Sequence, residues 1–130
     1  MNSVRKCWDF GTNESPHIPQ IQLLITSINF KKYSSHFFKI DTGFSGTLGI
    51  TPEIVNLLSL EPRGLMTIRT AIGTKEIPYF SLIVKCEEIN LKESLLFAIE
   101  TPRTVCGRSF LKNRKWLLDF KNSKFCYYKD

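Results

Sequence analysis

Short apolar runs separated by polar breaks dominate the sequence, and this pattern predicts short strands rather than long helices. Runs rich in β-branched and aromatic residues occupy positions 18–28, 37–40, 65–71, 75–84, 95–99, 116–120 and 125–128. A polar turn over 29–36 separates the first two runs, and positions 72–74 form the tip of a hairpin between the third and fourth. Apolar runs bounded by turn-forming residues are typical of strands and hairpins. We therefore expect an all-β domain.

Two short helices are expected to interrupt these strands. Thr51 supplies a capping hydroxyl, Pro52 suits the first helical position, and Glu53 brings a negative charge to the positive end of the helix dipole. The residues that follow, over 54–60, form one apolar side. A second short helix is expected over 108–113. The predicted fold class is therefore mainly β with two short helices.

The length of 130 residues leaves room for one domain. Positions 1–17 are polar and irregular, with Gly11, Asn13 and Pro16 among them, and they predict a loosely held N-terminal arm before a domain over 18–130. No apolar run reaches the ~18–20 residues of a bilayer-spanning helix, and none follows the basic pair Arg5-Lys6. We expect a soluble, cytoplasmic protein with no membrane partner.

The spacing of cysteine and histidine argues against a metal site. The cysteines form no Cys-x-x-Cys pair, and neither histidine has a ligand-type residue three or four positions later. Zinc ligands usually come in such close pairs. The sequence therefore predicts no metal and no organic cofactor, with reduced and mostly buried thiols. The cysteines are Cys7, Cys86, Cys106 and Cys126.

The net charge of +6 lies entirely in the C-terminal segment. From Arg103 onward, eight Lys or Arg residues accompany two Asp, whereas the earlier residues carry equal numbers of each sign. Such a segment can be a nucleic-acid footprint, in which an aromatic ring stacks on a base. No groove-entering motif and no regular aromatic–basic alternation is present, so a solvated charged face is favoured. A nucleic-acid-binding β-barrel would use Arg108, Lys112, Arg114, Lys115, Lys121 and Lys124, with Tyr127 or Tyr128 as the ring.

One carboxylate has a setting that favours chemistry. Asp41-Thr42-Gly43 follows the apolar run 37–40, and a turn containing Gly46 and Gly49 comes next, just before the capped helix. Glycine lets the backbone turn sharply, so that main-chain amides can hold the aspartate side chain. The local alternative is an Asx-type turn at a strand end, which Asp and Thr also favour.

The order of these motifs resembles the retropepsins, the retroviral-type aspartic proteases. Their pattern is a strand, an Asp-Thr-Gly turn, a central hairpin, and an apolar pair before a Gly-Arg-x-x-Leu run. The resemblance covers about 18–128, and the Asp-Thr-Gly-Phe-Ser-Gly stretch is similar to that of short bacterial and archaeal relatives as much as to viral enzymes. The more specific part is Val105-Cys106-Gly107-Arg108-Ser109-Phe110-Leu111, followed by Trp116-Leu117-Leu118-Asp119-Phe120.

The resemblance implies a partly open acid-protease barrel that acts as a homodimer on a peptide or protein substrate. Asp41 would be the catalytic carboxylate, Thr42 would hydrogen-bond across the dimer axis, and Gly43 would place its backbone beside the substrate. Gly107 would close the loop packed behind the aspartate. The terminal run 125–128 suits either a dimer interface or packing within one subunit. The flap over bound peptide would contain Ile72, Gly73 and Thr74.

The sequence departs from the family pattern at two positions of the turn. Phe44 stands where such enzymes usually carry Ala or Ser, so a bulky ring beside the turn is expected to narrow the cleft. Ser45 stands where viral enzymes place an aspartate that pairs with the arginine matching Arg108. That ion pair cannot form here, which leaves Arg108 as an ordinary solvent-facing or helix-start charge.

Peptide hydrolysis by this route needs two carboxylates about 3 Å apart that share one proton. The ionised one takes a proton from water, and the protonated one donates to the carbonyl oxygen. Neither Asp119, in an alternating strand, nor Asp9, in the arm, is followed by a glycine turn like that of Asp41. A two-fold homodimer that brings Asp41 of each subunit to the axis supplies the pair. The alternative within the same fold is a dimer that binds peptides without cleaving them, with Phe44 excluding water.

Overall fold

The computed structural model describes all residues except 1–2, 30–31 and 130. Most of the described residues lie in strands, which confirms the expected mainly β fold class with two short α-helices. In chain order the elements are β1 (Ser3–Asp9), β2 (Gln20–Thr26), β3 (Ser34–Ile40), β4 (Leu48–Ile50), α1 (Pro52–Leu57), β5 (Gly64–Thr70), β6 (Gly73–Cys86), the 3-10 turn η1 (Glu87–Ile89), β7 (Leu91–Glu100), β8 (Val105–Cys106), α2 (Arg108–Leu111), β9 (Lys115–Asp119) and β10 (Lys124–Lys129).

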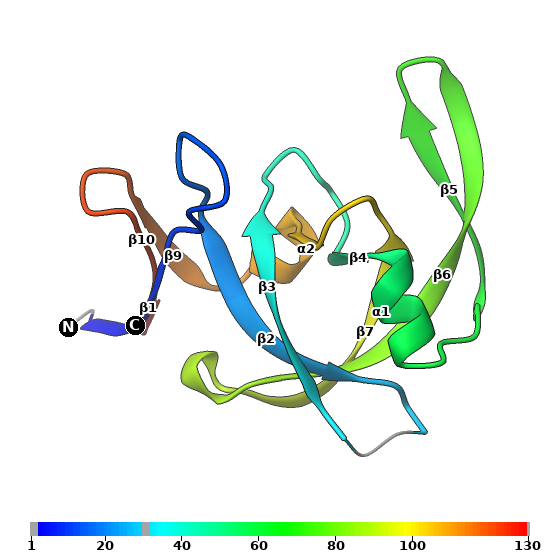
Figure 1. Ribbon diagram of the computed structural model, residues 1–130, viewed down its shortest axis with the longest axis horizontal. Coiled ribbons are helices and arrows are strands. Elements are labelled where there is room, and N and C mark those ends of the chain that lie inside the picture. Colours follow the sequence, from blue (N-terminus) through cyan, green and yellow to red (C-terminus); the bar gives the residue numbers. More distant parts are fainter. Residues whose placement is uncertain (1–2, 30–31, 130) are drawn as a thin grey trace.

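Six strands close into a barrel (Figure 1). Neighbouring strands follow the order β2-β3-β8-β4-β7-β6, and β6 returns to pair with β2. The β3–β8 and β4–β7 pairs are parallel, and the other four are antiparallel. Closure supplies partners to strands that would otherwise be unpaired edges.

Alternate side chains of the barrel strands fill its interior. Ile21, Leu23 and Ile25 of β2 are fully buried, because side chains two positions apart share one face of a strand. Ile54 and Leu58, from α1 and its C-terminal end, join the same core. The facing strands contribute Phe38, Leu48, Ile50, Phe80, Leu82, Val84 and Ala98.

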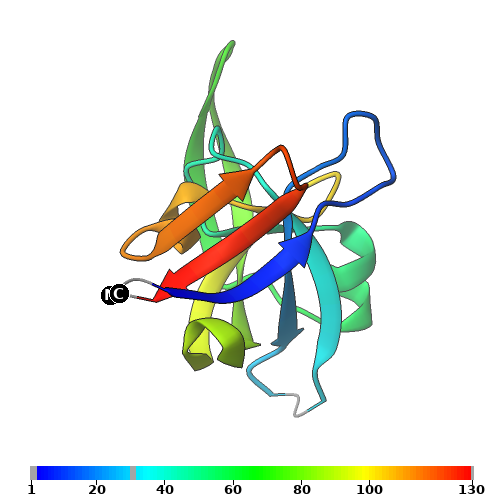
Figure 2. The same cartoon turned by 90° about the vertical axis from the view of Figure 1, so that its left-hand side faces the viewer.

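A second, three-stranded sheet joins the two ends of the chain (Figure 2). Its order is β1-β10-β9, antiparallel throughout. The expectation of a loosely held arm over 1–17 is therefore wrong for Ser3–Asp9, which pairs with β10 along its length, while residues 1–2 lie outside the described part. Trp8 and Phe10 are each 5% exposed, so this segment contributes to the core. The predicted strand pair 116–120 and 125–128 is confirmed as β9 and β10.

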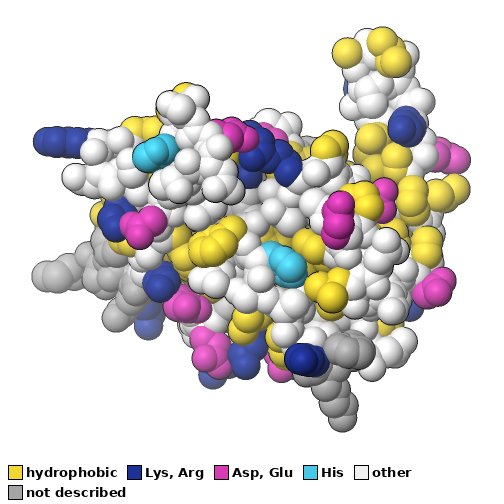
Figure 3. Space-filling view, viewed as in Figure 1, with side chains coloured by type: hydrophobic (Ala, Val, Ile, Leu, Met, Phe, Trp, Pro, Cys, Tyr) yellow, Lys and Arg dark blue, Asp and Glu magenta, His cyan; other side chains and the backbone are white. Residues whose placement is uncertain are grey.

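The predicted hairpin around Ile72 is confirmed. Strands β5 and β6 pair from Gly64 opposite Tyr79 to Thr70 opposite Gly73, and the hairpin projects from the barrel. Hydrophobic side chains gather on its surface, including its tip, in the space-filling view (Figure 3). Ile72 is 99% exposed, and Gly73 has a φ of +131°, a conformation that side chains rarely adopt.

Both predicted helices are present. The Thr51 hydroxyl accepts a hydrogen bond from the Ile54 amide at 3.4 Å and so caps α1, as its sequence predicted. Helix α2 ends at Leu111 because Lys112 is extended. The turn expected over 29–36 is shorter than predicted, since β3 already begins at Ser34, and positions 30–31 lie outside the described residues. No helix in the described part of the chain is both long and apolar enough to cross a bilayer.

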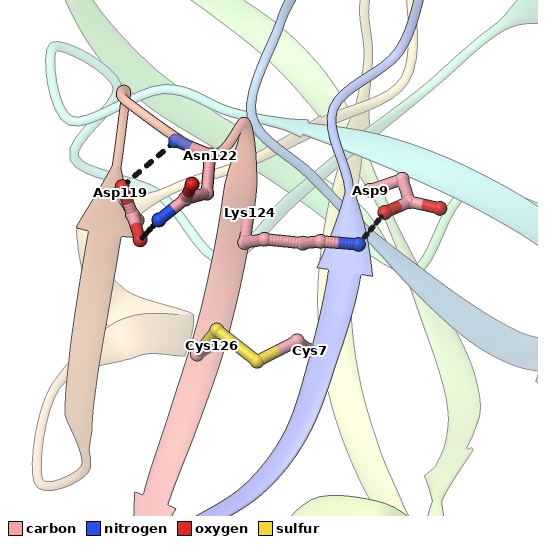
Figure 4. The surroundings of a disulfide bond; sticks show 6 residues. All are labelled: Cys7, Asp9, Asp119, Asn122, Lys124 and Cys126. Atoms are coloured by element: carbon pink, nitrogen blue, oxygen red, sulfur yellow. Dashed lines mark hydrogen bonds and ion pairs between the residues drawn. A yellow bond between two sulfur atoms is a disulfide. The ribbon is translucent and has the colours of Figure 1, made fainter.

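The cysteines divide into one disulfide and two free thiols. Strand register places Cys7 directly opposite Cys126, and a disulfide joins them (Figure 4). The expectation of reduced thiols is therefore wrong for this pair and holds for Cys86 and Cys106, which are free and buried. Burial raises the pKa of the Cys86 thiol to about 12 and also raises the pKa of Cys106, which keeps both thiols protonated.

Candidate active site around Asp41

Strand pairing at the end of β3 fixes the position of Asp41. The last residues of β3, Lys39 and Ile40, pair with Val105 and Cys106 of β8 in parallel register. The Asp41 amide then donates to the Cys106 carbonyl at 3.0 Å, which continues the ladder by one residue. The aspartate therefore leaves the barrel from a backbone position fixed by a neighbouring strand.

The turn after Asp41 orients its carboxylate. The Gly43 amide donates to Asp41 Oδ1 at 3.0 Å, and the Phe44 amide donates to the Asp41 carbonyl at 3.1 Å. The first contact is the hydrogen bond of an Asx turn, the local arrangement considered from the sequence. Asp41 is half-buried, and no hydrogen bond to Oδ2 is found among the described residues. One oxygen is therefore held by the backbone while the other remains available.

Hydrogen bonds tie residues 44–47 of the loop between β3 and β4 to the start of α2. Four donors from the α2 segment each meet a main-chain carbonyl of the loop. They run from Gly107 N to Thr47 O (2.9 Å), from Arg108 N to Phe44 O (2.9 Å), from Ser109 N to Gly46 O (3.2 Å) and from Ser109 Oγ to Ser45 O (2.6 Å). These bonds hold the loop, and with it Asp41, against the barrel. Sequence reasoning gave Ser109 no role, and its only signal was a hydroxyl at the expected start of a helix.

Close packing explains why position 107 is glycine. A Cβ added to Gly107 would overlap the Gly46 carbonyl oxygen and would lie 2.7 Å from Cδ2 of Phe44. The Phe44 ring also lies against Gly46, where an added Cβ would be 2.8 Å from Cε1. The Phe44 ring thus packs onto Gly46, in its own loop, and onto Gly107, the residue before α2. Gly107 therefore packs directly against the loop that carries Asp41.

The remaining residues of the turn face solvent in the single chain. Thr42, Gly43 and Ser45 are exposed, and so is Arg108. Ser45 takes part through its main-chain carbonyl, which accepts from Ser109. In the described part of the chain Arg108 has no ion-pair partner, so its side chain is a solvent-facing charge and its backbone amide binds the loop.

The hairpin tip is not brought against Asp41 in the single chain. Ile72, Gly73 and Thr74 are all exposed, and the tip's side-chain hydrogen bond stays within the hairpin, from Thr70 Oγ1 to the Gly73 carbonyl at 2.8 Å. The hairpin and the loop after β3 extend toward the same end of the molecule in Figure 1. A flap role would therefore need a substrate or a second subunit between them.

The two other aspartates considered from the sequence have partners of their own on the three-stranded sheet (Figure 4). Asp119 accepts from Asn122 N at 3.0 Å and from Asn122 Nδ2 at 2.9 Å, and these bonds lower the pKa of its carboxyl group. Asp9 forms an ion pair with Lys124. Both carboxylate oxygens of Asp119 accept hydrogen bonds, and Asp9 pairs its Oδ1 with a cation at the end of β1. Within the described residues, neither carboxylate accepts from the backbone amide of a glycine turn, as that of Asp41 does.

Neither a group of metal ligands nor a match to a known protein gives further information about this site. In the described residues, no three side chains of His, Cys, Asp or Glu come together in a way that could hold a metal ion. The chain matches no protein-family model and no curated protein. The arrangement around Asp41 is therefore the feature from which a function can be inferred.

Proposed function

We propose that the protein is an aspartic endopeptidase of retropepsin type, in which Asp41 of two subunits forms the catalytic pair of a homodimer. The observation that supports it most is the half-buried Asp41 carboxylate, with Oδ1 bound by the Gly43 amide and Oδ2 free of hydrogen bonds among the described residues. A carboxylate fixed in this way can meet a second one without first being reoriented.

The chemistry requires the second subunit. One carboxylate cannot both remove a proton from water and donate a proton to the carbonyl oxygen. Two Asp41 side chains sharing one proton supply both roles, because two carboxylates about 3 Å apart do not ionise together. The reaction then needs an activated water and a peptide carbonyl, with no cofactor.

The strand arrangement supports the retropepsin-like interpretation. β8 lies between β3 and β4, parallel to the first and antiparallel to the second. The aspartate loop connects β3 to β4, and Gly107 follows β8 directly behind it. The family resemblance rests on the order of motifs along the chain, and this strand pairing brings the aspartate loop and Gly107 together.

Two details argue against the alternatives. The Phe44 ring packs on Gly46 and Gly107, which weakens the idea that it stands in the cleft and excludes water. For the nucleic-acid alternative, Lys124 is paired with Asp9, and Tyr127 packs against Trp116 with ring centroids 5.5 Å apart. Some of the cations and rings that would contact a nucleic acid therefore already have partners within the chain.

Replacing Asp41 with asparagine tests the proposal. Asp41→Asn should reduce cleavage of an unbiased peptide library by about 10²-fold or more, because the shared proton is lost. The variant should keep the elution volume and thermal unfolding of the wild-type protein. Asp119→Asn is the matched control and should cleave normally. Cleavage by Asp41→Asn at the wild-type rate would exclude Asp41 as the catalytic group.

A further inference from the structure

A cavity of about 480 Å³ lies outside the loop of Asp41. It is bounded by η1 and the start of β7 on one side and by the connection from α2 to β9 on the other. Figures 1 and 2 both show η1 below that connection. The volume falls within the range of pockets that bind small molecules.

The cavity has an apolar floor and a polar rim. Leu91 and Phe110, at most 8% exposed, and the half-buried Leu96 and Tyr127 line its base, and Ile89 lies fully buried beneath them. Asn90 and Asn113 lie at the rim, each at a left-handed turn position, and both side chains are exposed. A few polar groups around an apolar base is the usual composition of a small-molecule site.

The charged side chains that line the cavity in the described part of the chain are both positive. Lys112 and Arg114 line the cavity, and no Asp or Glu among the described residues does. Within the described residues neither cation has an ion-pair partner, and Arg114 is half-buried. A guanidinium group that is partly removed from water without a partner is stabilised by an anion that accepts two of its N–H groups. The Ser109 hydroxyl is already donated to Ser45 O, so the donors left for a ligand are the two cations and the rim amides of Asn90 and Asn113.

We propose that this cavity binds a small amphiphilic anion, in which a carboxylate or phosphate monoester group is carried on an apolar or aromatic body. Arg114 and Lys112 hold the acidic group, and Leu91, Leu96 and Phe110 contact the body. The site is separate from the proposed peptidase chemistry and does not depend on it.

Binding of three matched probes tests this site. The probes are naphthyl phosphate, naphthoate and the neutral naphthalenemethanol, titrated into the full-length protein by calorimetry. At least one anion should bind with one-to-one stoichiometry and at least tenfold more tightly than the alcohol. Arg114→Gln should weaken that binding by about tenfold or more, because a charge-assisted pair is lost. Lys121→Gln removes the same charge from the β9–β10 turn, outside the cavity, and should bind as the wild type does.

The pattern of results separates the possibilities. Preference for naphthyl phosphate or for naphthoate identifies the acidic group. Failure of both anions to bind, equal binding of the alcohol, or equal losses in Arg114→Gln and Lys121→Gln would each overturn the proposal. Asp41→Asn should bind the probes normally, so loss of peptidase activity and loss of this site are distinguishable.

Discussion

Hydrogen-bond partners set the role of each acidic residue. Asp119 is satisfied by two donors from Asn122, whereas Asp41 has one backbone donor and one open oxygen. The sequence distinguished these residues by the glycine turn after Asp41, and the structure shows what that turn does. It places the Gly43 amide on the carboxylate. The partners of Asp119 could not be inferred, because its interaction with Asn122 depends on the geometry of the β9–β10 turn.

The pKa of the Asp119 carboxyl group should respond to Asn122. Donation by Asn122 lowers this pKa below its ordinary value of 3.8 in the folded protein. The resulting stability is present above pH 3.8 and is lost as the pH falls through the folded pKa. Asn122→Ala should move the pKa upward, as followed by NMR titration of the carboxyl carbon. Asn113→Ala is the control, and an unchanged pKa in Asn122→Ala would contradict the assigned cause.

His36 should make the protein sensitive to mild acid. Burial lowers its pKa below the ordinary 6.5, and its Nε2 lies 2.8 Å from Ser34 Oγ. The unfolded chain therefore binds a proton at a higher pH than the folded protein, and stability falls as the pH drops below 6.5. Urea unfolding from about pH 8 to about pH 5 should show a smaller loss for His36→Gln than for the wild type. His17→Gln should behave as the wild type, and equal losses in both variants would exclude His36.

Elements with local signals were predictable, and elements that depend on distant partners were not. The cap at Thr51 and the turn at Gly73 act within a few residues, and both α1 and the β5–β6 hairpin were expected. Strand β1 gains its structure from pairing with β10 at the other end of the chain. The apolar positions Trp8, in β1, and Phe10, just after it, are too few to indicate a strand by themselves. The Cys7–Cys126 disulfide was missed for the same reason, since its partners are 119 positions apart.

Gly107→Ala tests the packing between α2 and the Asp41 loop. The added methyl group would overlap the Gly46 carbonyl and lie 2.7 Å from the Phe44 ring, so we expect a loss of about 1–3 kcal/mol in unfolding free energy. Urea denaturation measures it. Gly64→Ala is the control, since its nearest neighbour is the movable Tyr79 ring at 3.0 Å. Equal stability of the two variants would show that the loop does not constrain position 107.

Reduction should destabilise the sheet that joins the chain ends. The Cys7–Cys126 bond closes a long loop, and its loss should lower the unfolding free energy by about 2–5 kcal/mol. Urea unfolding with and without dithiothreitol measures this difference. The double variant Cys7→Ser/Cys126→Ser should show no effect of dithiothreitol. Alkylation of four thiols in unreduced, denatured protein would show that the bond is absent.

Barrel closure places one Asp41 per molecule at the end of β3, and the whole molecule therefore holds half of the proposed site. The sequence predicted four strands of the barrel, β2, β3, β6 and β7, but not the short strands β4 and β8. It did not predict the strand order either, because the β3–β8, β4–β7 and β2–β6 pairs join segments far apart in the chain. The same closure leaves the hairpin around Ile72 projecting from the barrel, and its tip does not lie against the aspartate loop in the single chain. Sequence spacing could not have revealed where the hairpin lies relative to that loop. In the proposed dimer, a second copy would supply the other Asp41 carboxylate, and each projecting hairpin would cover the bound peptide.

Mixing wild-type protein with Asp41→Asn tests the shared site most directly. After subunit exchange, random pairing in an equal mixture leaves about half of the wild-type subunits in wild-type dimers. Peptidase activity per wild-type subunit should therefore fall to about one half, and further with excess variant. Asp119→Asn in place of the variant should leave the activity per wild-type subunit unchanged. Activity per wild-type subunit that does not fall with added Asp41→Asn would contradict a catalytic pair formed by two subunits.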